Sequence, residues 1–121
     1  MAQVEQALRS KKYKVVTITH VDTSTGADDS ISLFGHLRFS FPLGVLSDPQ
    51  IVADAVKRVS PETLVVLDAV CAVASEEIQM DDWGIDVVIS ASQKGLGAPP
   101  GLSIVIASQK AMKVKICLWS T

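Results

Sequence analysis

Short apolar runs alternate with amphipathic stretches along most of this chain, and the alternation predicts strands that follow helices. Two stretches carry apolar residues at helical spacing, residues 2–12 and 48–59, and a third helix is expected to begin at residue 108. The buried stripe expected for the second helix is Ile51, Val52, Ala55, Val56 and Val59. The runs that read as buried strands are residues 15–19, 63–67, 87–89 and 102–106. This order favours an α/β domain with a mostly parallel sheet.

Residues 27–44 interrupt this pattern. The segment shows neither a helical stripe nor a clean two-residue alternation, although it contains all three phenylalanines of the protein. A loop of this length and apolarity is uncommon inside a compact domain. We therefore expect an insertion that is foreign to the fold. Its end, LRFSFPLG, is what a pyrimidine-rich tract before a splice acceptor would encode, which favours a retained intron; an insertion specific to one lineage is the alternative.

Composition and charge narrow the class of protein. A chain of 121 residues with 48% apolar residues and a formal net charge of −2 can form one modest domain. No basic block and no apolar run of transmembrane length occurs, so neither nucleic acid nor a membrane is expected as a partner. The N-terminal residues lack the apolar region of a signal peptide, and Cys71 and Cys117 are too few for a disulfide framework. An intracellular, reducing compartment is therefore expected.

Polar residues follow two of the predicted strands, where an α/β sheet carries its ligands. Asp68 directly follows residues 63–67, and a carboxylate buried there without a partner would cost several kcal/mol, so it calls for a cation. An acid that caps the next turn is the alternative. Residues 20–26 follow the first strand and contain hydroxyls, one carboxylate and a glycine, which is typical of a ligand loop. A polar turn without a ligand is the alternative. We expect His20 to be a packing residue.

Lys94 lies between the last two predicted strands, in a stretch of small residues, glycines and prolines. Such a stretch indicates a shaped loop that can hold a lysine against a ligand. A surface lysine on an ordinary connection is the alternative reading. Residues 86–107 as a whole, however, resemble the pyridoxal-phosphate attachment site of the class V aminotransferases. The pattern has Gln93 before the Schiff-base lysine Lys94, a spacer of residues 95–100, and then Gly101 with apolar residues.

Two further segments support the same resemblance. THVDTSTG at residues 19–26 and DAVCAV at residues 68–73 are similar to cofactor-binding segments of this family. Within the family, SQKG followed by APPG looks most like the alanine–glyoxylate and serine–pyruvate aminotransferases of the fungal type. The resemblance implies an incomplete part of the large domain of fold-type I pyridoxal-phosphate enzymes, with a mostly parallel sheet. Residues 1–121 would form this partial domain, with residues 27–44 as an atypical insertion and residues 115–121 as a divergent tail.

The resemblance also assigns roles to individual residues. It makes Lys94 the catalytic lysine, which binds pyridoxal 5'-phosphate covalently and transfers a proton to and from the substrate. It pairs Asp68 with the protonated ring nitrogen of the cofactor and packs Val70 against the ring. Thr23 and Gln93 would form hydrogen bonds at the ring hydroxyl or the phosphate. The family implies no metal.

The implied reaction moves an amino group from alanine or serine to glyoxylate and gives glycine. Alternatives are an inactive truncated fragment, or another class V activity: serine–pyruvate transamination, phosphoserine transamination or cysteine desulfuration. The partners implied are small amino acids, 2-oxo acids and a second subunit in a homodimer. Peroxisome or mitochondrion is suggested by the family only, since residues 119–121 are not a peroxisomal signal. The family's phosphate-binding helix terminus and substrate-binding arginine have no match in this sequence.

Overall fold

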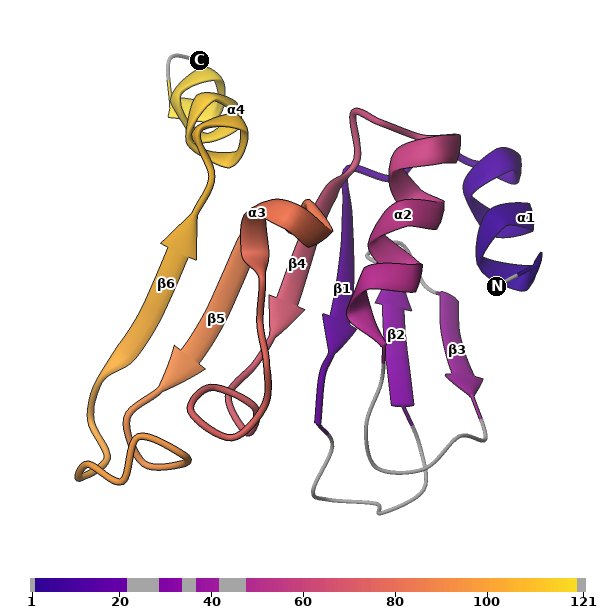
Figure 1. The fold of residues 1–121 in the computed structure, drawn as a ribbon. Coiled ribbons are helices and arrows are strands. Elements are labelled where there is room, and N and C mark those ends of the chain that lie inside the picture. Colours follow the sequence, from indigo (N-terminus) through magenta and orange to yellow (C-terminus); the bar gives the residue numbers. More distant parts are fainter. Residues whose placement is uncertain (1, 22–28, 34–36, 42–47, 120–121) are drawn as a thin grey trace.

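A six-stranded sheet with helices against one face forms the structure, a computed structural model that describes residues 2–21, 29–33, 37–41 and 48–119 (Figure 1). The strand order is β3-β2-β1-β4-β5-β6. The strands are β1 (Val15–Thr19), β2 (Asp29–Leu33), β3 (Leu37–Phe41), β4 (Leu64–Asp68), β5 (Val87–Ala91) and β6 (Ser103–Ala107). The helices are α1 (Ala2–Ser10), α2 (Pro49–Val59), α3 (Met80–Trp83) and α4 (Gln109–Trp119).

The centre of the sheet is parallel, as the sequence predicts. β4 lies between β1 and β5 and pairs with both in parallel, with Ile18 beside Leu67 and Leu67 beside Val88. Two longer connections that contain α2 and α3 carry the chain from β1 to β4 and from β4 to β5, as parallel pairing requires. The strands on both sides of this centre, β2 with β3 and β6, are antiparallel to their neighbours. The predicted α/β class is confirmed.

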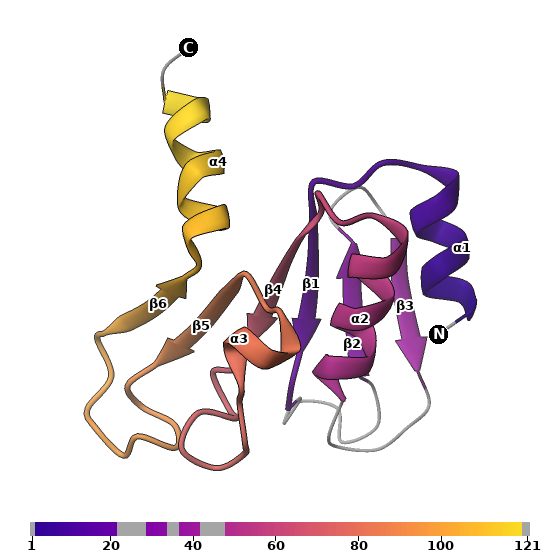
Figure 2. The same ribbon diagram turned by 45° about the horizontal axis from the view of Figure 1, so that its top comes forward.

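The core lies between one face of the sheet and the first two helices. Side chains alternate between the two faces of a strand, so Val16, Ile18 and Leu67 point to the same side. Figure 2 shows α1 and α2 over that side of the sheet. The helical residues that complete this core are Val4, Leu8, Val52, Ala53 and Val56. Each fully buried Val, Leu or Ile stabilises the fold by roughly 1.5–3 kcal/mol relative to exposure.

Helix α2 begins and ends where the sequence predicts, but its buried stripe is rotated. The Asp48 carboxylate accepts a hydrogen bond from the Ile51 amide at 3.2 Å, and Pro49 occupies the first turn. Ile51 was expected in the core, yet it is 50% exposed, and Ala53 is buried instead. The apolar arc centres on Val52 and Val56, and Ile51 lies outside it. The prediction was wrong because apolar character alone does not fix the helix rotation.

The expectation of a loop at residues 27–44 is also wrong. The structure forms β2 and β3 inside this segment, and β2 pairs antiparallel with β1. The sequence signal for β3 lies in residues 37–41, LRFSF, which alternate strictly between apolar and polar positions, as a strand with one buried face does. In the paired register Ile31 lies opposite Phe39 and Leu33 opposite Leu37. The segment therefore extends the sheet beyond β1.

Strand β6 is found as predicted, but it is not a buried strand. Val105 is 62% exposed and Ile106 is 55% exposed, although they project to opposite faces of the sheet. The physical reason is the position of β6 at the end of the sheet, beside β5 only, where no described helix covers it (Figure 1). Helix α4 continues past the end of β6 and away from α1 and α2.

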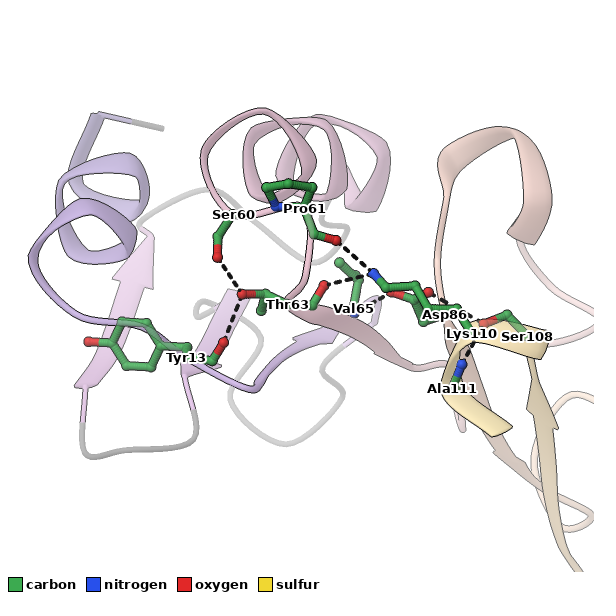
Figure 3. A network of polar contacts seen from close by, with 9 residues as sticks. All are labelled: Tyr13, Ser60, Pro61, Thr63, Val65, Asp86, Ser108, Lys110 and Ala111. Carbon is green, nitrogen blue, oxygen red and sulfur yellow. Dashed lines mark hydrogen bonds and ion pairs between the residues drawn. The ribbon is translucent and has the colours of Figure 1, made fainter. Parts of the chain in front are cut away.

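A buried carboxylate ties the amino ends of β4 and β5 to α4 (Figure 3). Asp86 Oδ2 accepts a hydrogen bond from the Val65 amide at 2.9 Å and lies 3.4 Å from Lys110 Nζ. Ser108 Oγ donates to Asp86 Oδ1 at 3.4 Å, and Lys110 also donates to the Pro61 carbonyl at 2.9 Å. The carboxylate is thus paired with both an amide and a cation, which offsets the cost of burying it.

Candidate functional site

The carboxyl ends of the three parallel strands meet at one edge of the sheet, and Asp68 lies in the middle of that edge. It is the last residue of β4, with Thr19 of β1 on one side and Ile89 of β5 on the other. The His20 amide donates to the Asp68 carbonyl at 3.0 Å, and the Ala69 amide donates to the Ile89 carbonyl at 2.9 Å. These bonds continue the sheet to its edge, where open α/β sheets bind their ligands.

The side chain of Asp68 is exposed, which corrects the expectation of a buried carboxylate. Because it alternates with the buried Leu67, it lies on the face of the sheet opposite α1 and α2. Its Oδ1 atom accepts a hydrogen bond from the Val70 amide at 3.1 Å, and Val70 itself is half-buried. Because the carboxylate is exposed and accepts a hydrogen bond from the Val70 amide, the fold does not need a cation there. A cation remains something that this carboxylate can bind.

Lys94 lies just beyond the end of β5, in the connection between β5 and β6. This connection, residues 92–102, is called the lysine loop below. Both Lys94 and Gln93 are exposed, and the Gly97 amide donates to the Lys94 carbonyl at 2.9 Å to close a turn. The Lys94 side chain is therefore accessible to a ligand, while a hydrogen bond holds the backbone of its turn.

The lysine loop touches the connection that begins with Asp68. A Cβ atom added to Gly95 would lie 2.2 Å from the Val73 carbonyl oxygen and 2.9 Å from Ser75 Oγ, so the two backbones pass at close range. Val73 in turn donates its amide to the Ala69 carbonyl at 3.0 Å. The structure thus brings the loop that carries the lysine against the connection that follows β4, the strand that ends with Asp68.

A model of the family described as "Aminotransferase class-V" matches residues 39–117 of this chain. The chain belongs to the class V aminotransferase family. It is 41% identical over 109 residues to alanine–glyoxylate aminotransferase 1 of Saccharomyces cerevisiae, across 90% of this chain and 24% of that relative. It is 31% identical over 114 residues to a serine–glyoxylate aminotransferase of Methylorubrum extorquens, across 92% of this chain and 24% of that relative.

A solved structure of a class V relative supports the same assignment. The crystal structure of an alanine–glyoxylate aminotransferase from Nostoc sp. superposes with a TM-score of 0.71 at 26% identity. That match covers 93% of this chain and 25% of the solved chain. The fold is that of fold-type I pyridoxal-phosphate aminotransferases, as the resemblance implied. This chain spans about a quarter of the length of the relatives it matches.

The described residues include two groups whose chemistry suits the class V cofactor. An exposed amine can bond to the cofactor aldehyde, and an exposed carboxylate can pair with a protonated ring nitrogen; Lys94 and Asp68 provide these groups at neighbouring strand ends. Gln93 adds an amide beside the amine. Val70, which was expected against the ring, follows Asp68 by two residues, and Thr23, the remaining predicted cofactor-binding residue, lies outside the described residues. The donor set therefore fits pyridoxal phosphate.

Three residues near these strand ends received no role from the sequence. Thr19 lies directly beside Asp68 in the register of β1 and β4 and shares its face of the sheet. Ser92 and Gly95 shape the lysine loop. The signal for Thr19 was its position at the end of a predicted parallel strand. Ser92 and Gly95 could not be recognised, because their roles depend on contacts across the loop and with another segment.

His20 follows the packing role that the sequence predicts. Its ring is 3% exposed and meets the Trp83 ring edge-on, with 6.2 Å between the ring centroids. Burial lowers its pKa below the usual 6.5, because the charged imidazolium loses hydration, while Glu76 and Asp48 oppose this effect by attracting the proton. The ring therefore packs the end of β1 against Trp83 of α3.

Within residues 2–21, 29–33, 37–41 and 48–119, no group of three or more His, Cys, Asp or Glu side chains is placed to hold a metal ion. In the same ranges no helix has the length and apolarity needed to cross a membrane.

Proposed function

We propose that this chain provides the lysine-bearing part of a pyridoxal-phosphate-dependent transaminase, which moves the amino group of alanine or serine to glyoxylate and forms glycine. The observation that supports the proposal is the contact at Gly95 between the loop of Lys94 and the connection that begins at Asp68. The relatives described above are named for alanine or serine as the donor, and glyoxylate appears in all three names.

Each site residue has a chemical role in this proposal. Bound pyridoxal phosphate withdraws electrons from the α-carbon of an amino acid and so weakens the bond to its proton. The Lys94 amine would hold the cofactor by a covalent bond and, once released, take the proton from the substrate α-carbon and return it. The Asp68 carboxylate would keep a proton on the ring nitrogen. Thr23 and Gln93 would donate hydrogen bonds, and Val70 would pack against the ring.

A second candidate is a chain without enzymatic activity. Its support is that the chain spans about a quarter of its relatives and leaves the apolar residues of β6 exposed. A different class V activity, such as serine–pyruvate or phosphoserine transamination or cysteine desulfuration, is a further alternative. A homodimer, glycine biosynthesis and a peroxisomal or mitochondrial location belong to the main proposal, on the family resemblance alone.

Covalent labelling tests the role of Lys94. The purified chain is incubated with pyridoxal phosphate, reduced with borohydride and digested, and the labelled lysines are identified by mass spectrometry. We expect the label at Lys94 in preference to the exposed Lys113, because Lys94 follows the strand next to the one that ends with Asp68, whereas Lys113 lies on α4. Lys94→Ala should remove the preferred label, and the matched variant Lys113→Ala should keep it. Equal labelling of all exposed lysines would contradict the proposal.

Amino-transfer assays separate the candidate activities. Alanine or serine is supplied with glyoxylate, and the glycine formed is measured; phosphoserine and cysteine serve as competing substrates. The proposal expects glycine formation that depends on pyridoxal phosphate and disappears in Lys94→Ala. Selective labelling of Lys94 without any turnover would instead support the inactive chain.

A further inference from the structure

Ser92 joins the two ends of the lysine loop. Its amide donates to the Leu102 carbonyl at 3.2 Å, and its carbonyl accepts from the Ala98 amide at 3.0 Å. Its hydroxyl donates to the Pro99 carbonyl at 2.6 Å and accepts from the Leu102 amide at 3.4 Å. The residue is 2% exposed. One small side chain thus adds two cross-loop hydrogen bonds that alanine cannot form.

Gly95 fixes the middle of the same loop. Any side chain at this position would collide with the Val73 carbonyl, which is backbone and cannot rotate away. Gly97, two residues further, differs: its φ of +63° favours glycine, but an added Cβ would meet no atom within 4 Å. Glycine is therefore required at position 95 because the loop passes close to the Val73 carbonyl. At position 97 it is favoured by the positive φ of the turn.

We infer that Ser92 and Gly95 are positioning residues, which hold the Lys94 amine beside the strand end of Asp68. Ser92 holds the two ends of the lysine loop together by hydrogen bonds. Gly95 lets the loop pack closely against the connection that follows β4. The inference rests on the proposed function, because it gives Lys94 a partner to be positioned against. Without these contacts the lysine keeps its reactivity but loses its fixed orientation. Small misplacements lower the rate of an oriented reaction by about tenfold to a hundredfold.

The variants Ser92→Ala and Gly95→Ala test this inference by the labelling ratio of Lys94 to Lys113. Each is expected to lower the ratio by about tenfold. Ser92→Thr keeps the hydroxyl and is expected to restore most of the preference. Ser103→Ala, at an exposed position at the start of β6, is the matched control for the serine and is expected to stay within about twofold of the parent. Gly97→Ala strains the turn without meeting another atom, so it is expected to lower the ratio less than Gly95→Ala does.

Amide hydrogen exchange supplies a second readout that needs no cofactor. Ser92→Ala should speed exchange at Leu102, whose amide bonds to the hydroxyl, and Gly95→Ala should speed exchange at Val73. Circular dichroism establishes that each variant is folded; if Ser92→Ala is unfolded, Gly95→Ala carries the test alone.

The outcomes separate this inference from the proposed function. A parent chain that prefers Lys94, with variants that keep the preference, would overturn the positioning roles and leave the function standing. A parent chain without preference would overturn the function, and the positioning roles with it. An equal loss of labelling preference in Gly97→Ala and Gly95→Ala would contradict the role of Gly95. It would show that strain in the loop, and not the close contact with Val73, determines the preference for Lys94.

Discussion

His20 is a single residue whose protonation the fold controls. Its buried ring packs against Trp83, and burial keeps its pKa below 6.5. In the unfolded chain the same ring regains its hydration and its usual pKa. Between the lowered pKa and 6.5, the unfolded state therefore binds more protons than the folded state, and the free energy of unfolding falls as the pH falls.

We expect His20 to make the free energy of unfolding smaller at acid pH. Urea unfolding is measured between about pH 7.5 and about pH 5.5, a range in which few other side chains titrate. The free energy of unfolding should decrease toward the acid end in the parent chain and decrease less in His20→Gln, which has no charge to acquire. The same slope in both proteins would show that the buried ring does not set this dependence.

Strand β6 is the element whose surroundings least match its sequence. Its residues, SIVIA, contain no charge and no proline, and its outer edge has no strand beside it in the described sheet. Natural proteins protect such edges with charges, prolines or bulges, because free backbone donors and acceptors recruit another strand. An uncharged strand is also compatible with a second copy of itself in the antiparallel direction.

We expect copies of the chain to associate through β6 as concentration rises. Val105→Lys places a charge on this edge and should shift the association to higher concentration in analytical ultracentrifugation. Ile51→Lys is the matched control, because it introduces the same charge at a similarly exposed apolar position on α2. If Val105→Lys associates like the parent while Ile51→Lys does not, the contact lies elsewhere.

In the whole molecule, β1, β4 and β5 contribute residues to the described core, and β2 and β3 lie outside these three strands in the sheet. The described core is built from residues of α1, β1, α2, β4 and β5, together with residues of the connections between them. The strands β2 and β3 of the 27–44 segment extend the sheet beyond β1. The retained-intron origin of this segment remains a prediction, since a sheet can also be extended by residues that the fold does not require.

The insertion hypothesis predicts that mature transcripts lack the codons for residues 27–44. Sequencing of the messenger RNA decides this directly. It also predicts that a chain in which Gly26 is joined to Val45 keeps the far-ultraviolet circular dichroism of a folded α/β protein, because the parallel pairs β1–β4 and β4–β5 remain. Transcripts that all retain these codons, or a shortened chain that is unfolded, would contradict the hypothesis.

The sequence by itself determined the elements of the parallel centre and the residues at their ends. Strand and helix periodicity and the strand-end positions of Asp68 and Lys94 are local properties, and they are found as predicted. Only the tertiary structure decided the strand order, the exposure of Asp68, Ile51 and β6, and the close contact of Gly95 with Val73. The physical reason is that periodicity depends on residues close together in the sequence, whereas burial and contact depend on which distant segments pack together.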